Sequence, residues 1–346
     1  MTASFPVDML PFFSEGYDMN GLARDVASAI LVGVLLPAII IQAGILIDRE
    51  KTVSVSLEHQ TEETVLTEST LSMMFLDEEG NFSSMGLDEY LVGAVLGEMP
   101  ADFELEALKA QAVAARTYAW KTHLSGVKHD NGAVCGNYAC CQAYISQEQY
   151  LANGGLAKNI EKIRTAVLET SDLVLTYDGN LIEATYFSCS GGKTEDAVAV
   201  WGNDFPYLRS VESPGEEHAA WFTDEAVFDR SQLETALGIS LPENPENWFG
   251  EITYTNGGGV ETIRIGDELF SGTKLRGLLR LRSTAFEVTV RDCAAVFHTR
   301  GYGHRVGMSQ YGADAMAVRG ADYTEILAHY YPGTALMTLE QNKRIA

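Results

Sequence analysis

Basic residues are scarce in this chain of 346 residues, in which 24 Lys and Arg stand against 48 Asp and Glu and give a formal net charge of −24. Binding to nucleic acid needs clustered basic side chains that neutralise phosphates, so this imbalance argues against a nucleic-acid partner. A neutral or sugar-like substrate fits the composition better. The acidity is also typical of the solvated surface of a secreted protein.

Several catalytic signatures are missing as well. The chain has no strand–GxxxxGK[ST]–helix unit, which argues against a phosphate site, and no G-x-S-x-G elbow of a serine hydrolase. It also has no internal repeat. What it does have is 46% hydrophobic residues and 10% aromatic residues. That is enough apolar material for a real core, and it excludes a disordered protein.

One long apolar run stands near the N-terminus. Residues 26–47, VASAILVGVLLPAIIIQAGILI, continue for 22 positions without a charge, which is enough to span a bilayer. A buried core helix rarely lacks polar positions for so long, and a cleaved signal peptide usually has a shorter apolar region. We expect a tail (1–25), a transmembrane anchor (26–47), a spacer (48–70) and a globular region (71–346). The flanking charges Arg24, Arg49 and Lys51 leave the orientation open.

The globular region mixes helical and strand patterns without regular βαβ order. Hairpin signals occur at 71–87, around Asp178-Gly179-Asn180 and around Asn256-Gly257-Gly258-Gly259, and further strands are expected at 285–290 and 294–299. Helical spacing starts after Asp88, continues from Leu105 and returns around Ile160. The sequence therefore predicts an α+β fold in which helices and antiparallel hairpins form a cleft.

Glu98 is a candidate general acid. It stands in Gly97-Glu98-Met99-Pro100, where the proline breaks the first helix, and apolar neighbours favour the neutral form that an acid catalyst needs. A single glutamate at a helix end is more often a surface or capping residue. A second carboxylate for hydrolysis is available nearby, unless these acids only stabilise a helix N-terminus: Asp102, Glu104 and Glu106.

A cluster of soft metal ligands lies in the stretch HDNGAVCGNYACC. It contains His129, Cys135, Cys140 and Cys141, which suit a tetrahedral zinc site although the spacing is not that of a standard finger. A disulfide and buried free thiols are the alternatives. Five cysteines is an odd number and adjacent cysteines pair poorly, so disulfides would leave a thiol unexplained. The residues alone do not distinguish a zinc site from a disulfide.

Two glycine-containing loops are candidate ligand-binding segments. Ser188-Cys189-Ser190-Gly191-Gly192 follows an expected strand and offers hydroxyl and amide groups, although it would also serve as a plain turn. Cys189 suits small-residue packing better than nucleophilic catalysis. In GYGHRVGMSQ, residues 301–310, the glycines permit close approach of the backbone to a ligand, and the following helix displays Ser309 and Gln310.

Three stretches taken together resemble the stage II sporulation protein D family. They are EYLVGAVLGEMPADFELEALKAQAVAARTYAW, then SCSGGKTEDAVAVWGNDFPYLRSVESP, then GYGHRVGMSQYGADAMAVRG with a closing ILAHYYPGTAL. They occur in the family's order and cover roughly residues 71 to 340, with an anchor where that family has one. Cys189 and Arg305 depart from the family's pattern.

The resemblance implies a lytic transglycosylase that cleaves peptidoglycan during engulfment in endospore-forming bacteria. Glu98 falls on the family's catalytic glutamate, and the His129 cluster falls on its zinc ligands, with Cys140 in place of a histidine. Four protein ligands imply a structural zinc. Family positions for shaping the cleft or holding glycan fall on Arg116, Tyr118, Ser188, Ser190, Gly191, Gly192 and Lys193.

The resemblance also implies partners and a location. The expected substrate is a glycan strand stripped of stem peptides by a sporulation amidase, and the expected site is the mother-cell engulfing membrane, with the catalytic region extracytoplasmic and facing the space between mother cell and forespore. A membrane scaffold of the engulfment complex is a further expected partner. We expect Glu98 to act first as acid and then as base, with Gln310 helping to align the sugar. The alternatives are a glycan-binding scaffold and a lysozyme-like hydrolase that uses Asp102 or Glu106.

Overall fold

The computed structural model describes residues 69–343, which belong to one compact unit. The predicted tail (1–25), the predicted anchor (26–47) and all but the end of the spacer (48–70) lie outside the described residues. Within the part of the chain that the structure describes, none of the helices combines the length and the hydropathy that a membrane crossing needs.

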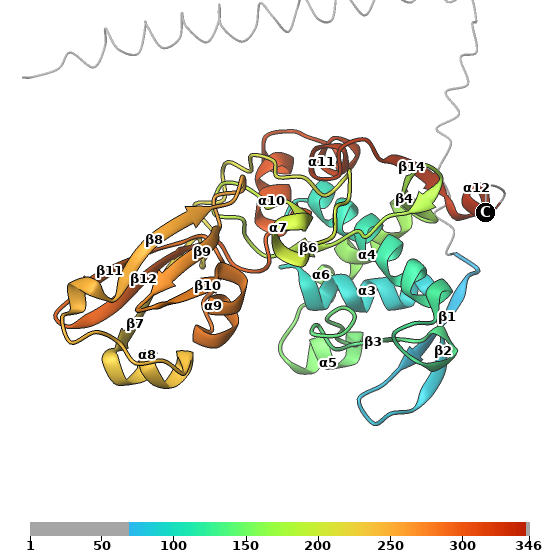
Figure 1. The fold of residues 1–346 in the computed structure, drawn as a ribbon. Coiled ribbons are helices and arrows are strands. Elements are labelled where there is room, and N and C mark those ends of the chain that lie inside the picture. Colours follow the sequence, from blue (N-terminus) through green and yellow to red (C-terminus); the bar gives the residue numbers. More distant parts are fainter. Residues whose placement is uncertain (1–68, 344–346) are drawn as a thin grey trace, which may run out of the picture. The chain divides into compact units, whose positions relative to one another are not determined.

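The first hydrophobic core gathers elements from both ends of the described chain (Figure 1). At its centre, α4 packs against α3, α6, α10, α11 and β4, and its many fully buried alanines let these neighbours approach closely. Its elements are β1 (Ser72–Leu76), β2 (Phe82–Gly86), α3 (Leu87–Glu98), α4 (Leu105–Ser125), η3 (Asp130–Gly132), β3 (Val134–Cys135), α5 (Gln147–Ala152), α6 (Ala157–Glu169), β4 (Leu173–Tyr177), β5 (Asn180–Leu181), β6 (Tyr186–Phe187), α7 (Ala197–Trp201), β13 (Met308–Ser309), α10 (Gln310–Val318), α11 (Tyr323–Tyr330), β14 (Ala335–Thr338) and α12 (Leu339–Lys343).

The second core is built from one continuous stretch, residues 223–300, between β6 and β13 in sequence. Two three-stranded antiparallel sheets, in the orders β10-β9-β8 and β11-β12-β7, enclose it together with two helices. Phe297 lies at its centre, where the rings of Phe228, Phe249 and Phe286 meet it edge-on. Its elements are β7 (Thr223–Asp229), α8 (Arg230–Leu237), η4 (Pro245–Asn247), β8 (Phe249–Tyr254), β9 (Val260–Ile265), β10 (Glu268–Ser271), α9 (Gly272–Leu279), β11 (Phe286–Arg291) and β12 (Ala294–Arg300).

The predicted α+β fold with antiparallel hairpins is confirmed. The expected hairpins are present as β1/β2 and β8/β9, and the two strands expected at 285–290 and 294–299 pair with each other as β11 and β12. The hairpin around Asp178-Gly179 is also present, with the positive φ at both positions that a tight two-residue turn requires, but its second strand is only β5. The chain then leaves the sheet, and Tyr186–Phe187 pairs in parallel with β13 instead.

Candidate functional site

The predicted cleft is a pocket of about 900 Å³ that brings together residues from 97 to 310. Its lining comes from the end of α3 and the loop that precedes α5. It also comes from α4, from the segment around β6, from α7 and α9, and from the loop before β13. The residues that line it are Gly97, Glu98, Tyr118, Lys128, Tyr138, Ala139, Cys140, Cys141, Gln142, Ala143, Ala184, Thr185, Tyr186, Phe187, Ser188, Trp201, Arg276, Tyr302, Gly303, His304 and Gln310.

Glu98 is the last residue of α3, and its place follows from the local sequence. The residue before a proline is forced out of helical geometry, and Met99 accordingly has extended angles (φ −125°, ψ 143°). The Glu98 side chain is half-buried, and its Oε1 accepts a hydrogen bond from the backbone N–H of Ala143 at 2.7 Å. Desolvation raises the pKa of the Glu98 carboxyl, while the Ala143 N–H and the Gln310 side chain oppose that change. Because burial dominates, the protonated form persists to higher pH, as a general acid requires.

Two glycines of α3 let the Ala143 segment reach Glu98. A Cβ on Gly97 would lie 3.0 Å from backbone atoms of Ala143 and Tyr144, and one on Gly93 would collide with the Tyr144 ring. The backbone N–H of Ile145 also donates to the Gly93 carbonyl oxygen at 3.1 Å. The glycine beside the acid therefore permits the close approach that creates its hydrogen bond.

Gln310 places a buried amide beside Glu98 in the pocket. It begins α10, only 5% of it is exposed, and its Nε2 makes no hydrogen bond of ordinary geometry with any described residue. An unpaired buried amide is costly unless a ligand or water satisfies it. This is the property expected of a side chain that holds a polar substrate.

Among the described residues that line the pocket, Glu98 is the only carboxylate. The candidates for a second catalytic carboxylate lie elsewhere. Glu106 pairs with Lys109 at 2.7 Å and accepts the Tyr323 N–H at 3.0 Å, and neither Asp102 nor Glu104 lines the pocket. The pocket therefore offers one acid rather than the facing pair of a hydrolase.

The four predicted metal ligands come together. One ligand atom from each of His129, Cys135, Cys140 and Cys141 lies within 4.8 Å of the others. Cys140 Sγ is 3.3 Å from His129 Nε2 and 4.0 Å from Cys141 Sγ, and all the thiols are free. Zinc bonds of about 2.0–2.3 Å place tetrahedral ligand atoms roughly 3.3–3.8 Å apart, so the donor set fits zinc. Cys140 and Cys141 also line the pocket, close in sequence to Ala143.

The Ser188 to Lys193 loop is brought only partly to the pocket. Ser188 lines it, whereas Ser190, Gly191, Gly192 and Lys193 do not. The buried Glu216 carboxylate holds the loop in place, because it accepts hydrogen bonds from Ser190 N at 2.6 Å, Ser190 Oγ at 2.9 Å and Gly191 N at 3.1 Å. Lys193 forms an ion pair with Glu212 at 3.4 Å.

The two residues that depart from the family pattern are structural. The Cys189 thiol is fully buried 3.1 Å from Glu216, and this burial raises its pKa, which disfavours a nucleophilic thiolate. The buried Arg305 donates to three carbonyl oxygens, those of Ser190, Lys193 and Gly257. Arg305 therefore joins the loop after β6 to the β8–β9 turn of the second core.

Tyr118 and Arg116, neighbours on α4, have different environments. Tyr118 lines the pocket and its hydroxyl donates to the Cys140 carbonyl oxygen at 3.4 Å. The structure does not bring Arg116 to the pocket, because its side chain is fully buried and donates to the carbonyl oxygens of Val167 at 2.9 Å and Leu173 at 3.3 Å. Arg116 holds α4 against α6 and β4.

Sequence reasoning missed several residues of the pocket. They share no single motif, and the pocket unites them only through the tertiary fold: Lys128, Gln142, Tyr186, Trp201 and Arg276. Tyr302 and His304 also line the pocket and belong to the segment 301–310 that the sequence indicated, although neither was named as a site residue. Gln142 belongs to a buried chain of hydrogen bonds in which its Oε1 accepts from Tyr90 at 2.9 Å and its Nε2 donates to Tyr186 at 2.7 Å. The sequence signal for His304 was its position between Gly303 and Gly307, and the signal for Trp201 was the glycine that follows it.

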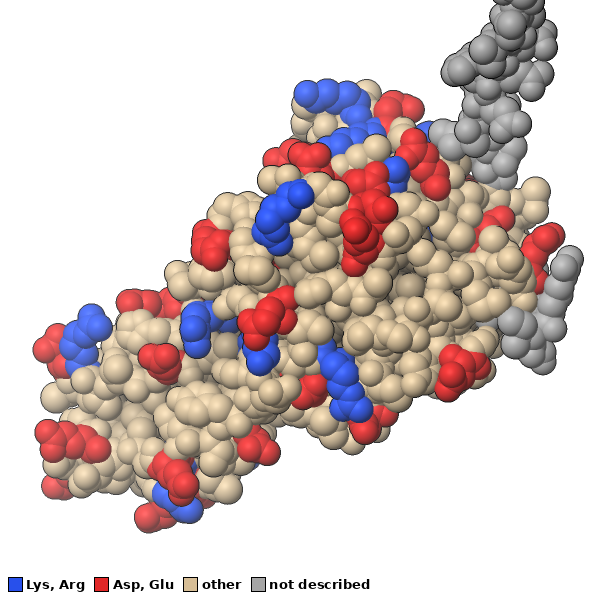
Figure 2. All heavy atoms as spheres, turned by 90° about the horizontal axis from the view of Figure 1, so that it is seen from above, with Lys and Arg blue, Asp and Glu red and all other residues tan. Residues whose placement is uncertain are grey.

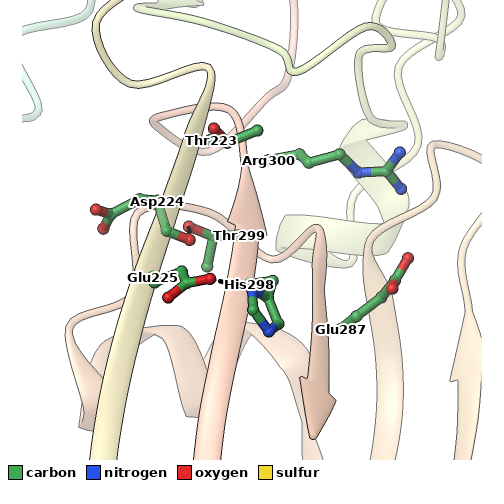
Figure 3. Close-up of a pocket in the computed structure, with 7 residues that line it drawn as sticks. All are labelled: Thr223, Asp224, Glu225, Glu287, His298, Thr299 and Arg300. Atoms are coloured by element: carbon green, nitrogen blue, oxygen red, sulfur yellow. Dashed lines mark hydrogen bonds and ion pairs between the residues drawn. The ribbon is translucent and has the colours of Figure 1, made fainter.

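A second hollow, of about 590 Å³, lies on the sheet β11-β12-β7 (Figure 3). His298 projects from β12 toward Glu225 on β7, with Nδ1 2.9 Å from Oε1. None of the site residues predicted from the sequence lines this hollow. On the face seen in Figure 2, acidic and basic side chains are interspersed without a broad basic area, in keeping with the argument against nucleic acid.

Two known proteins similar to this chain, and one family profile that matches it, are described as stage II sporulation proteins. The profile of the family described as Stage II sporulation protein matches residues 77–177. Stage II sporulation protein D of Bacillus amyloliquefaciens is 35% identical over 314 residues, which cover 87% of this chain and 91% of that protein. Its counterpart in Bacillus subtilis is 35% identical, with 85% and 87% covered.

A third similar protein carries a different name. The amidase enhancer of Bacillus subtilis is 31% identical over 303 residues, which cover 71% of this chain and 40% of that protein. The two relatives described before it match nearly end to end, at an identity that indicates common descent and a shared fold. This chain therefore belongs to the stage II sporulation protein D family.

Proposed function

We propose that this chain is a peptidoglycan lytic transglycosylase that cleaves the bond from N-acetylmuramic acid to N-acetylglucosamine and leaves a 1,6-anhydro end. The observation that carries the proposal is the half-buried carboxyl group of Glu98, the only one among the described residues that line the pocket, whose pKa is raised by desolvation. A transglycosylase of this kind needs only one protein carboxyl group, because the C6 hydroxyl of the sugar itself is the nucleophile.

Glu98 acts in both halves of the proposed reaction. As a carboxylic acid it donates its proton to the glycosidic oxygen, which leaves with the N-acetylglucosamine side as an oxocarbenium-like state develops. As a carboxylate it then accepts the proton of the C6 hydroxyl while that oxygen bonds to C1. The proton count on Glu98 is restored, and no water is consumed. The Ala143 N–H, 2.7 Å from Oε1, stabilises the carboxylate between the two halves.

The polar groups around Glu98 orient the sugar. The Nε2 of Gln310, beside Glu98, is a donor for a sugar or N-acetyl oxygen, and Ser188, Tyr118 and Tyr186 add groups along the same pocket. Alignment of the C6 hydroxyl over C1 is the main contribution that such contacts make to the rate.

The His129 cluster, in this proposal, holds a zinc ion through His129, Cys135, Cys140 and Cys141. Bound zinc supplies structural cross-linking only, because four protein ligands leave no position for water or substrate. The loop that bears the cluster continues into Ala143, so the cross-link supports the donor that contacts Glu98.

The biological setting of the proposal follows the family and the relatives. Similarity to an amidase enhancer supports a link to a cell-wall amidase, which would strip stem peptides before this chain acts. We place the reaction at the mother-cell engulfing membrane, in the space between mother cell and forespore, with residues 26–47 as the anchor and the engulfment scaffold as a partner.

Digestion of peptide-free glycan strands tests the proposal. The purified full chain should release anhydro-ended fragments, and Glu98→Gln should lower the rate by ~10³-fold, within the range of general acid catalysis. Glu89→Gln is the matched control, because Glu89 is exposed on the same helix and does not line the pocket. Equal rates for Glu98→Gln and Glu89→Gln would refute the role of Glu98, and no cleavage by the parent chain would favour a glycan-binding scaffold.

A further inference from the structure

The pocket is locally basic in a strongly acidic protein. Among the described residues that line it, Lys128 and Arg276 are cationic and Glu98 is the only acid, whereas the whole chain has a formal net charge of −24. Glu98 is uncharged when it is ready to act as an acid. Apart from the metal-binding cysteines, the lining then carries the two formal positive charges of Lys128 and Arg276, which a neutral sugar chain does not require.

Arg276 is the cation without a counter-charge. It projects from α9 of the second core and is partly buried, and this desolvation lowers its pKa. Its Nε donates to the Arg282 carbonyl oxygen at 3.3 Å, and no carboxylate of a described residue forms an ion pair with its guanidinium.

The guanidinium of Arg276 keeps its charge despite the lowered pKa, because arginine side chains remain protonated in proteins. Its two Nη groups are therefore a charged, planar pair of donors on a residue that lines the pocket. That arrangement matches the two oxygens of a carboxylate.

Lys128, the other cation, is already engaged. Its ammonium group contacts the Tyr118 hydroxyl and the Cys140 carbonyl oxygen, and its side chain is largely exposed. A surface ammonium with two polar partners has less need of a further anion than a partly buried guanidinium that has one backbone contact. Arg276 is therefore the stronger candidate for an anionic group of the ligand.

An aromatic surface lies beside Arg276. The His304 ring is 5.2 Å from the Trp201 ring and 5.6 Å from the Phe187 ring, measured between centroids, and Trp201 is 40% exposed. Desolvation, with the charge of Arg276 as the second cause, lowers the pKa of His304 to about 4, so this imidazole is neutral at pH 7. A sugar ring can lie against these apolar faces while Arg276 contacts a charged substituent.

We propose that Arg276 binds the free lactyl carboxylate of N-acetylmuramic acid and so acts as a specificity-determining residue of the proposed reaction. This inference rests on the proposed function. A stem peptide is joined to the lactyl group through an amide, which is neutral and bulky, and hydrolysis of that amide by an amidase leaves a carboxylate. Arg276 pairs with the carboxylate and gains no ion pair from the amide.

Binding measurements on three glycans test the inference, with the full chain in a Glu98→Gln background so that nothing is cleaved. The glycans are peptide-free strands, the same strands with their lactyl carboxylates converted to methylamides, and oligomers of N-acetylglucosamine, which have no lactyl group. The parent chain should bind the free-carboxylate strands about tenfold more tightly than the methylamides, as expected for one charge-assisted contact.

Arg276→Gln should abolish that preference by weakening binding of the free-carboxylate strands about tenfold while leaving the other two glycans unchanged. Unchanged binding of the methylamide strands also shows that the variant is folded. The matched control is Arg280→Gln, because Arg280 is exposed at the C-cap of the same helix and does not line the pocket. It should retain the preference in full.

Two results would overturn the inference: equal affinity of the parent chain for carboxylate and methylamide strands, or an equal loss for all three glycans in Arg276→Gln. Cleavage by the chain with Glu98 intact is measured separately. Cleavage without selectivity removes the role of Arg276 and leaves the proposed function standing. Selective binding without cleavage removes the proposed function and leaves the role of Arg276 standing.

Discussion

At the scale of single residues, the chemistry depends on how Glu98 is shielded from water. Its neighbours Gly97, Met99 and Pro100 are apolar, and the fold adds burial that raises the pKa of the carboxyl. The sequence could indicate the local environment and the helix end at Pro100. It could not indicate the donor from Ala143, because 45 residues separate the two in the chain.

The pH profile of cleavage should follow the raised pKa of Glu98. The acid form is required in the free enzyme, so kcat/KM should fall as pH rises through that pKa, with a midpoint above the ordinary value for glutamate. Gln310→Leu removes a side chain that favours the carboxylate and should move the midpoint further up. Steady-state rates across pH provide the measurement, and a midpoint at the ordinary glutamate value would contradict the role of burial.

Arg116 was expected at the glycan but lies inside the protein, and its replacement should affect stability. Arg116→Gln leaves an Asp88 carboxylate 3.7 Å away without its charge partner and should lower the free energy of unfolding by about 3 kcal/mol. Glycan affinity of the folded variant should stay unchanged. Urea unfolding measures the free energy of unfolding. Arg209→Gln, which removes one partner of an exposed ion pair, is the control and should change it by less than about 1 kcal/mol.

At the scale of elements, the contact between α3 and the Ala143 segment joins the acid to the metal loop. The cluster and Glu98 belong to different segments of the chain. In the structure, Cys140 and Cys141 line the same pocket as Ala143. The ligand pattern was visible in the sequence, whereas its place beside the acid depends on how the loop packs across Gly93 and Gly97.

A larger residue at position 97 should separate α3 from the Ala143 segment. Alanine normally stabilises a helix interior by up to about 1 kcal/mol relative to glycine, but at Gly97 its Cβ would press on the Ala143 and Tyr144 backbone at 3.0 Å. Gly97→Ala should therefore lower the cleavage rate. Gly277→Ala on α9, where a Cβ meets nothing within 4 Å, should keep the rate and gain stability. Equal behaviour of the two variants would argue against the close contact.

Metal analysis tests the zinc proposal at this same scale. The purified chain should contain zinc, and Cys135→Ser should reduce both its zinc content and its cleavage rate, because the wall that bears Ala143 loses its cross-link. Cys293→Ser should retain both, since Cys293 is exposed and lies outside the cluster. A parent chain without zinc would rule the proposal out.

At the scale of the whole molecule, the fold class and most hairpins followed from hydrophobic periodicity and turn residues. The pocket did not, because its lining comes from segments between residues 97 and 310 and includes Arg276 from the second core. Local sequence patterns do not indicate that α9 of the second core lines the same pocket as Glu98 of the first core. The loop 188–193 is a second example. Only Ser188 lines the pocket, whereas Ser190 and Gly191 are hydrogen-bonded to the buried Glu216, which the sequence did not indicate.

The most direct test of the central claim is the mass of the products formed from peptide-free glycan strands in water enriched in oxygen-18. If Glu98 activates the C6 hydroxyl of the sugar, the new end is an anhydro ring, lighter than a reducing end by one water and free of the heavy oxygen. If the chain is a hydrolase, the new reducing end carries oxygen from the labelled water. Unlabelled anhydro ends are the result that our account predicts, and labelled reducing ends formed during cleavage would contradict it.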